Sequence, residues 1–218
     1  MRVTCNRPWL TFDLGEEMQV LSWAINRPGL VFANRILWRE VRDADLPPEL
    51  DVEQWLAVEL SARNDVASVC FLTSRDVRCH EIKEALAGEL RAEVVATVGL
   101  SNAERVGFRQ SSRARWGTIN IAIRLSQGLS SIGLIEAATI AAEARTAAVM
   151  DVGFHLPQGL ATGTGTDCIA VAAPQGMNGY AGLHTEVGEV IGAAVYGAVR
   201  AGAENWKGQN RRSLNDTN

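Results

Sequence analysis

The chain has 218 residues, of which 47% are hydrophobic and 21% are charged, and its formal net charge is -4 at pH 7. This composition is typical of one globular domain and excludes a wholly disordered chain. The negative net charge and the lack of a basic block argue against nucleic-acid binding through phosphate neutralisation.

The N-terminus and the cysteines indicate the cellular compartment. The first residues lack a basic segment followed by an apolar one, so we expect no secretory signal. No apolar run approaches the roughly 20 residues that cross a bilayer, so we expect no membrane partner. The four cysteines are scattered and match no zinc-ligand spacing. Together these features predict a reduced, cytoplasmic protein.

Short apolar or β-branched segments in the first third of the chain predict β-strands. They are residues 8–12, residues 18–25, either residues 30–32 or residues 36–41, and residues 66–72. Gly15 and the acidic residues beside it predict a turn between the first two strands. Residues 51–63 carry apolar side chains at helical spacing after Asp51, a candidate N-cap, so this segment predicts a helix.

The middle of the chain predicts alternating elements. Residues 77–87 repeat apolar side chains at helical spacing, and residues 93–98 predict a further strand. The order strand, helix, strand predicts a layered α/β arrangement with part of the sheet parallel. Residues 104–116 are rich in arginine and serine, and we expect them to form an exposed excursion.

Residues 116–123 alternate between polar and apolar side chains, which predicts a strand. Thr118 and Asn120 stand two positions apart in this strand, so both side chains point to the same face. That face either binds a ligand or is simply solvated.

The C-terminal half predicts two long helices, at residues 132–150 and 185–203, and a buried strand at residues 168–173. The polar residues 205–218 predict a flexible tail. We therefore expect a single layered α/β domain over residues 1–204, with a mixed sheet flanked by helices.

Two acids and a histidine on or beside these helices are candidate functional residues. Glu143 shares a helical stripe with apolar residues, nearly opposite Arg145, which predicts a buried acid that is either catalytic or bonded to a loop amide. Glu189 projects away from the apolar face of the last helix. His184 precedes that helix and is either a capping residue or a catalyst.

A polar loop enters the strand at residues 168–173. Its residues are Thr162, Gly163, Thr164, Gly165, Thr166 and Asp167, and Cys168 follows them. Glycine permits tight backbone geometry and the close approach of a ligand, and each threonine adds a hydroxyl. Such a loop can fix reactive side chains on rigid structure, although a glycine-rich turn that binds nothing has the same composition.

Five polar blocks stand out along the chain: residues 100–103, 117–121, 142–148, 161–167 and 180–189. Taken in this order, they resemble the adenosylcobinamide amidohydrolase family of corrinoid salvage, most closely over residues 65–203. The resemblance implies hydrolysis of the amide that joins aminopropanol to the corrin ring side chain of adenosylcobinamide, which gives adenosylcobyric acid and 1-amino-2-propanol. The family pattern includes Asn102, Asn120, Glu143, Asp167, His184 and Glu189. A cysteine after Asp167 is not a regular part of it.

Amide hydrolysis needs an activated nucleophile, stabilisation of an oxyanion and a proton for the amine leaving group. On this resemblance, we expect Asp167 or Glu143 to act as general base on water and His184 to protonate the departing nitrogen. Backbone amides of residues 163–166 would donate to the oxyanion. The candidate substrate-binding residues are Asn102, Thr118, Asn120, Thr162, Gly163, Thr164, Gly165, Thr166 and Glu189.

Three alternatives stay open. Cys168 could be a thiolate nucleophile paired with His184, although its apolar surroundings would raise the thiol pKa. A divalent metal could be held by Asp167, His184 and a glutamate and activate water; no other cofactor is expected. The chain could also carry a corrinoid or a nucleotide without chemistry. The expected partner is a small-molecule corrinoid substrate, and a homodimer stays open as the oligomeric state.

Overall fold

Eight strands form one mixed sheet in the computed structural model, which describes residues 2–109 and 117–215. They follow one another in the order β4-β3-β2-β12-β8-β6-β5, and β1 pairs with β2. β3 is parallel to β4 and β8 to β12, and the other neighbours are antiparallel. The expected mixed α/β class is therefore confirmed. The strands are β1 (Arg2–Asn6), β2 (Trp9–Ser22), β3 (Gly29–Glu40), β4 (Val69–Thr73), β5 (His80–Ala87), β6 (Leu90–Val98), β8 (Ile119–Leu125) and β12 (Cys168–Ala173).

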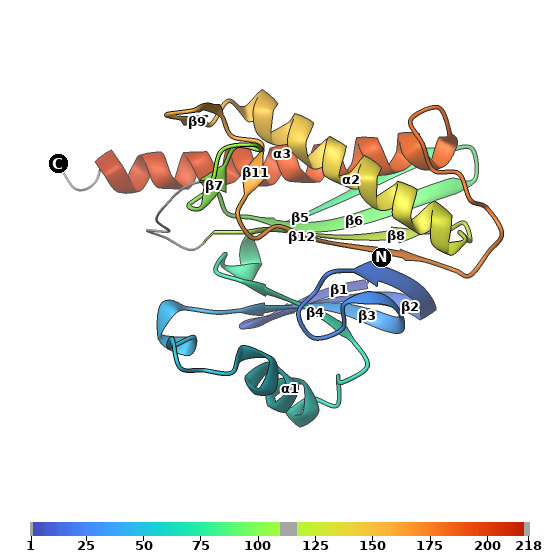
Figure 1. The fold of residues 1–218 in the computed structure, drawn as a ribbon, viewed down its shortest axis with the longest axis horizontal. Coiled ribbons are helices and arrows are strands. Elements are labelled where there is room, and N and C mark those ends of the chain that lie inside the picture. Colours follow the sequence, from blue (N-terminus) through green and yellow to red (C-terminus); the bar gives the residue numbers. More distant parts are fainter. Residues whose placement is uncertain (1, 110–116, 216–218) are drawn as a thin grey trace.

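The sheet folds back on itself, so that strands β1 to β4 face strands β5, β6, β8 and β12 (Figure 1). Side chains from both halves, such as Phe71, Val95 and Ala122, pack into one buried cluster between them. A hydrogen bond 2.8 Å long, from Asn120 Nδ2 on β8 to the carbonyl oxygen of Leu72 on β4, also joins the two halves.

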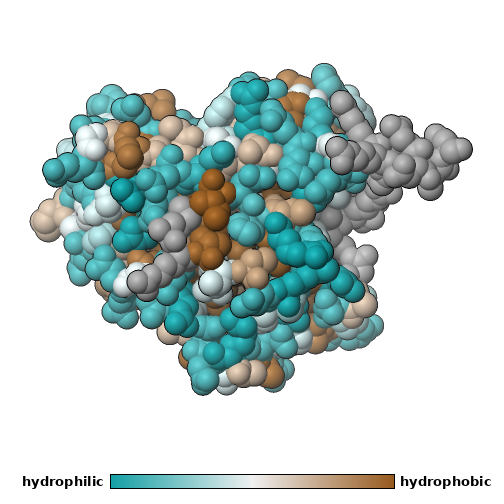
Figure 2. All heavy atoms as spheres, turned by 180° about the vertical axis from the view of Figure 1, so that it is seen from behind, coloured by the Kyte–Doolittle hydropathy of each residue, from teal (hydrophilic) through white to brown (hydrophobic). Residues whose placement is uncertain are grey.

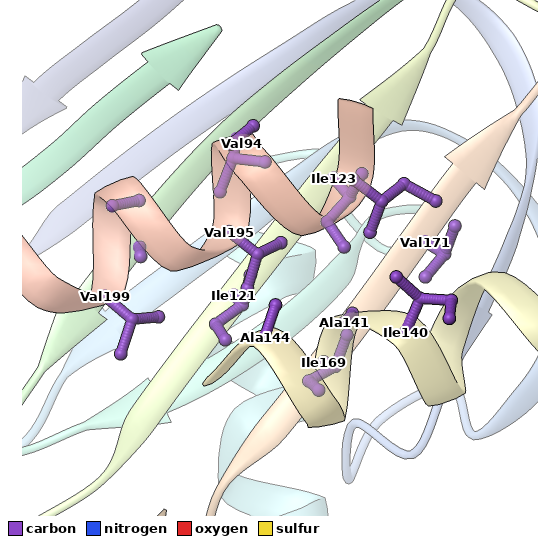
Figure 3. Close-up of a cluster of buried hydrophobic side chains, with 14 of the residues drawn as sticks. Val94, Ile121, Ile123, Ile140, Ala141, Ala144, Ile169, Val171, Val195 and Val199 are labelled. Atoms are coloured by element: carbon purple, nitrogen blue, oxygen red, sulfur yellow. The ribbon is translucent and has the colours of Figure 1, made fainter. Parts of the chain in front are cut away.

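Helices cover both outer faces of the folded sheet (Figure 1). They are α1 (Val52–Ala62), α2 (Ser131–Val152) and α3 (Glu186–Asn215). Helix α1 lies against the half formed by β1 to β4, and α2 and α3 lie against the other half. Figure 3 shows the core on that side, where Ile121 and Ile169 of the sheet meet Ala141 and Ala144 of α2 and Val195 of α3. The small alanines let α2 approach the sheet closely.

In the first third of the chain, the sequence predicted a helix after Asp51 and a turn at Gly15. The helix after Asp51 is confirmed: the Asp51 carboxylate accepts from the Gln54 N–H at 3.0 Å, and Leu56 and Leu60 are buried against the sheet. The turn at Gly15 is wrong, because the two segments that it was expected to separate form the single strand β2.

The reason is a local irregularity in place of a turn. Gly15 has φ +82° and lies where the pairing register of β2 with β3 shifts, between Asp13 and Met18. The strand therefore accommodates extra residues and continues. The two alternatives for the third strand, residues 30–32 and 36–41, likewise belong to one strand, β3, except for residue 41, which lies just beyond its end.

The helix predicted at residues 77–87 is wrong. Apart from one short 3-10 turn (Val77–Cys79), the segment is the strand β5, which pairs antiparallel with β6. Ile82 and Leu86 are four residues apart, a spacing that suits a helix and also places both on one face of a strand. Gly88, with φ +57°, turns the chain into β6, and this close hairpin decides for the strand.

The other strands predicted from the sequence are found as β4, β6, β8 and β12, with shifted ends for the first three. Helix α3 does not stop near residue 203 but continues to Asn215, so the tail predicted at residues 205–218 is helical up to that point, and residues 216–218 lie outside the described residues. Of the predicted excursion at residues 104–116, residues 110–116 also lie outside them. Two short pairs complete the fold: β7 (Ala103–Glu104) with β11 (Gly163–Thr164), and β9 (His155–Leu156) with β10 (Gly159–Leu160).

One face of the molecule is largely hydrophilic where its residues are described. Figure 2 shows the face opposite to that of Figure 1, on which hydrophobic residues are scattered apart from one compact group near its middle. No helix within residues 2–109 and 117–215 combines the length and the apolar character that a bilayer crossing requires.

Candidate functional site

A cavity of about 610 Å³ lies between the two halves of the sheet, where β8 and β12 begin. Apolar side chains form most of its wall, among them Trp23, Ile25 and Leu46 from the N-terminal part of the chain. Its polar side chains include Thr73, Ser74, Thr118, Asn120, Thr166 and Asp167. A mostly apolar hollow with a few convergent polar groups is the usual form of a small-molecule site.

Asp167 is the one carboxylate among the described residues of this lining, and its side chain is 8% exposed. Its Oδ1 accepts from the Ile119 N–H at 3.1 Å and from the Thr164 hydroxyl. Its Oδ2 accepts from the Thr164 N–H at 3.0 Å and forms an ion pair with Arg145. Asp167 thus ties the glycine-threonine loop to β8 and to α2.

Arg145 reaches Asp167 from the middle of α2. Burial lowers the pKa of the Arg145 guanidinium, because removal from water disfavours its charged form, and the Asp167 carboxylate supplies the opposite charge. Gly163 allows this approach, since a Cβ at that position would lie 2.5 Å from Arg145 Nη1 and from Asp167 Oδ2. The glycine is therefore needed for the ion pair to form beneath the loop.

Neighbouring polar groups fix the wall on either side of Asp167. The Thr118 hydroxyl lies 2.8 Å from the Thr166 carbonyl oxygen and 3.1 Å from Asn120 Oδ1, so its single proton is shared between two acceptors. The Thr166 hydroxyl donates to the Gly117 carbonyl oxygen at 3.1 Å. The Trp23 indole donates to the Asp167 carbonyl oxygen at 2.8 Å and thereby joins the end of β2 to the loop.

Asn102 supports this loop from behind and does not line the cavity. It is buried, its backbone carbonyl oxygen accepts from the Gly165 N–H at 3.2 Å, and its Nδ2 has no hydrogen-bond partner within residues 2–109 and 117–215. A Cβ on Gly165 would lie 2.7 Å from Glu104 Oε1 and 3.1 Å from Asn102 Nδ2. The second glycine of the loop therefore also permits a close contact within the protein.

The glycine-threonine loop separates two cavities. Gly165 and Thr166 line the cavity that contains Asp167, whereas Thr162, Gly163 and Thr164 line a second cavity of about 520 Å³. Two of the backbone amides expected to bind an oxyanion are already used, because Thr164 N donates to Asp167 and Gly165 N donates to Asn102. The predicted oxyanion hole of residues 163–166 is therefore wrong for these two donors.

The structure does not bring the predicted catalytic residues together. Glu143 lies on the solvent-exposed face of α2, and the stripe that it shares with Ile132 and Met150 faces away from the core. The prediction of a buried Glu143 is wrong because the buried face of this helix, formed by Gly133, four alanines, Leu134, Ile140 and Val149, does not include Glu143. Arg145 has the inward position instead.

His184 and Glu189 lie at the start of α3, which adjoins the C-terminal end of β12, whereas Asp167 precedes its N-terminal end (Figure 1). Both side chains are exposed, and neither lines either cavity. The expected meeting of Glu143, Asp167 and His184 around one carbonyl is therefore not observed.

The two alternatives that depended on His184 also lack the required geometry. Among the described residues, no three His, Cys, Asp or Glu side chains are grouped so that they could hold a metal ion. Cys168 lines the cavity beside Asp167, but burial raises the pKa of its thiol to about 11, and its polar neighbour is the Ser22 hydroxyl, 3.8 Å away. A thiol with this pKa is neutral near pH 7 and is a poor nucleophile.

Sequence reasoning missed Arg145 and the contribution of the N-terminal strands. Arg145 follows Ala141 by four residues and precedes Ala148 by three, so it shares their side of the helix, but only the structure shows that this side is buried. Trp23 and Thr73 reach the cavity only through the sheet order, which places β2 and β4 near β8 and β12. No local pattern in the sequence predicts that neighbourhood.

Comparison with known proteins identifies the family. A family model described as adenosylcobinamide amidohydrolase matches residues 1–211 of the 218 residues, which includes the N-terminal strands as well as the glycine-threonine loop. No curated protein matches the chain. Because the match covers nearly the whole chain, the protein belongs to the adenosylcobinamide amidohydrolase family and is a hydrolase that acts on an amide carbon–nitrogen bond.

Proposed function

We propose that this protein hydrolyses the amide between the corrin ring side chain of adenosylcobinamide and its aminopropanol, and that the reaction takes place in the cavity lined by Asp167. One observation carries this proposal. Asp167 is the single carboxylate among the described residues that line a mostly apolar cavity, and Arg145 holds it in place. The products are adenosylcobyric acid and 1-amino-2-propanol, and the acid can re-enter cobamide synthesis.

The size of the cavity suits the side chain of the substrate rather than the whole corrin ring. Pockets for small ligands usually measure about 300–1,000 Å³, and a volume of about 610 Å³ accommodates an amide arm with its aminopropanol. The flat ring would then rest on the rim, where Trp23 is 51% and Ile25 39% exposed. An apolar rim next to a polar floor matches an amphipathic macrocycle with amide arms.

Asp167 can provide both proton transfers. Three of its four donors are fixed, namely two backbone N–H groups and the Arg145 guanidinium, whereas the Thr164 hydroxyl can rotate away from Oδ1. Oδ1 would then accept a proton from a water molecule as the water oxygen bonds to the amide carbon. The same proton passes to the amide nitrogen, the carbon–nitrogen bond breaks, and the amine leaves in neutral form.

Asn120 and Thr118 are placed to bind the amide. Asn120 Nδ2 donates one proton to the Leu72 carbonyl oxygen, and an amide nitrogen carries a second proton, which it can offer to the carbonyl oxygen of the substrate. The hydroxyl of Thr118 holds Asn120 Oδ1 and thus the orientation of this donor. A buried donor beside the reacting carbonyl stabilises the negative charge that develops on its oxygen.

The test is the release of 1-amino-2-propanol from adenosylcobinamide. We expect Asp167→Asn to lower kcat at least about 100-fold, since a general base typically contributes a factor of that size or more. Glu143→Gln is the matched control, because it makes the same chemical change, from carboxylate to amide, on an exposed acid. We expect the kcat of Glu143→Gln and of His184→Ala to stay within about threefold of that of the unsubstituted enzyme. Loss of activity in these two variants, with normal activity in Asp167→Asn, would move the reaction to another site.

A second prediction concerns Cys168. Because burial raises the pKa of its thiol to about 11, the thiol is protonated at neutral pH and we expect no acyl-enzyme on sulfur. Cys168→Ala should therefore keep kcat within about threefold of normal, and mass spectrometry of the enzyme during turnover should show no covalent adduct. An inactive but folded Cys168→Ala protein would restore the thiolate mechanism.

The proposal also places the enzyme in a reducing compartment such as the cytoplasm. All four cysteines lie within the described residues, and all four are free. Free cysteines, of which Cys70 is fully buried, suit a compartment that keeps thiols reduced.

A further inference from the structure

The second cavity, on the other side of the glycine-threonine loop, has the composition of an anion site. It measures about 520 Å³ and lies between the turn that follows β7, the middle of α2 and the strand β11. Three arginines, Arg105, Arg109 and Arg145, line it, and Glu104 is the only carboxylate among its described lining residues. Positive charge therefore exceeds negative charge among the lining residues that the structure describes.

Two of the arginines are held in place by the protein. Arg105 donates from Nη1 to the Leu160 carbonyl oxygen at 2.9 Å. Its guanidinium also lies against Gly159, since a Cβ on that glycine would lie 3.4 Å from Arg105 Nη1. Arg145 is fixed by Asp167. Arginine side chains that are ordered before binding lose less entropy when a ligand arrives, which favours recognition of a planar or tetrahedral anion.

Arg145 has donor capacity that the protein leaves unused. Its Nη1 binds Asp167, but its buried Nε has no hydrogen-bond partner among the residues that the structure describes. An unpaired buried donor costs stability, and this cost is larger when the group is charged. Arg145 also lines the second cavity, where a bound anion would lie against a guanidinium that the protein already holds in place.

The outer part of the cavity is apolar. Val106 and Phe108, in the turn after β7, are 77% and 53% exposed and line the same cavity as the arginines. The turn itself is fixed, because Phe108 N donates to the Arg105 carbonyl oxygen at 3.0 Å and Val106 N donates to the Thr162 hydroxyl at 2.8 Å. A ligand that fits both parts carries an anionic head and an apolar or aromatic body.

We propose that this cavity binds the phosphate group of a small phosphorylated molecule, with Arg105, Arg109 and Arg145 around the phosphate and Val106 and Phe108 against the organic part. Guanidinium groups match phosphate oxygens in geometry and charge. The site is separate from the proposed catalytic cavity, although both share the Arg145–Asp167 pair.

The experiment titrates the purified protein with inorganic phosphate and with phenyl phosphate by calorimetry, against sodium chloride and sodium acetate at equal ionic strength. We expect saturable binding at one site per chain for both phosphates, with phenyl phosphate the tighter of the two, and no saturation with chloride or acetate. Arg105→Gln and Arg109→Gln should each weaken the binding about tenfold, the size expected for one charge-assisted hydrogen bond.

Arg91→Gln is the matched control, because it also removes one positive charge from a partly exposed arginine, but on β6, where Arg91 pairs with Glu84. It should leave phosphate affinity unchanged. Equal weakening by Arg91→Gln and Arg109→Gln, or binding of phosphate no stronger than that of acetate, would overturn the proposal. The titration contains no corrinoid, so its outcome is independent of whether the protein hydrolyses adenosylcobinamide.

Discussion

Replacing Arg145 with methionine is expected to lower the free energy of unfolding by about 3–5 kcal/mol, the range measured when one partner of a buried ion pair is removed. The reason is that Asp167, 8% exposed, would lose the guanidinium that is its ion-pair partner, and a buried carboxylate without an opposite charge is costly. The loop around Asp167 would also lose its connection to α2. Under the proposed mechanism, kcat should also fall, because Arg145 holds the Asp167 carboxylate in place.

Urea denaturation measures the first effect, and release of 1-amino-2-propanol measures the second. Arg200→Met is the matched control, since Arg200 pairs with Glu204 on the surface of α3, where both side chains are at least half exposed, and such pairs contribute at most about 1 kcal/mol. The double variant Arg145→Met with Asp167→Asn should recover part of the lost stability, because it leaves no buried charge unpaired. Similar losses in Arg145→Met and Arg200→Met would contradict the importance given to the buried pair.

Gly188→Ala is expected to destabilise the protein by about 3 kcal/mol, the upper part of the usual range for overpacking. Gly188 lies in the first turns of α3, and a Cβ there would overlap the Gly182 carbonyl oxygen and lie 2.7 Å from the carbonyl oxygen of Ala181. Both obstacles are backbone atoms, which cannot move aside as a flexible side chain can.

Gly192→Ala provides the matched control, one helical turn further along α3. A Cβ at Gly192 has no heavy atom within 4 Å outside its own helix and chain neighbours, so the substitution should stabilise the protein by up to about 1 kcal/mol through helix propensity. Thermal unfolding of the two variants should therefore shift in opposite directions. If Gly188→Ala unfolds at the same temperature as Gly192→Ala, the close packing of α3 against residues 181–182 is not important for stability.

Local sequence patterns predicted most elements of the fold correctly where the pattern had one interpretation. Helix α1 has both a capping aspartate and apolar residues at helical spacing. Strand β12 is a short run of apolar residues, which is too short for a helix and suits a buried strand. The pattern failed for β5, since Ile82 and Leu86 suit both a helix and a strand, and the hairpin with β6 decided between them. Pairing partners far along the chain are outside the reach of a local pattern.

The candidate site shows the same limit. The polar loop before β12 and the residues Thr118 and Asn120 were predicted as one site, but only Gly165 and Thr166 of the loop line a cavity with Thr118, Asn120 and Asp167, and Thr162, Gly163 and Thr164 line the second cavity. Glu143 and Arg145 could not be assigned correctly because a helical wheel gives the angle between two side chains but not which face meets the sheet. The buried face combines four alanines with Leu134, Ile140 and Val149, whereas Ile132, Ile135 and Met150 stay exposed, so hydrophobicity alone does not identify it.

The central place of β12 has a consequence for synthesis on the ribosome. Strand β12 bonds to β2 on one side and to β8 on the other, yet it is the last strand to be made. Until residue 173 has emerged, the nascent chain exposes two unpaired strand edges, which favour aggregation. Completion of the sheet must wait for a contact between residues more than a hundred positions apart, so we expect slow folding that benefits from chaperones.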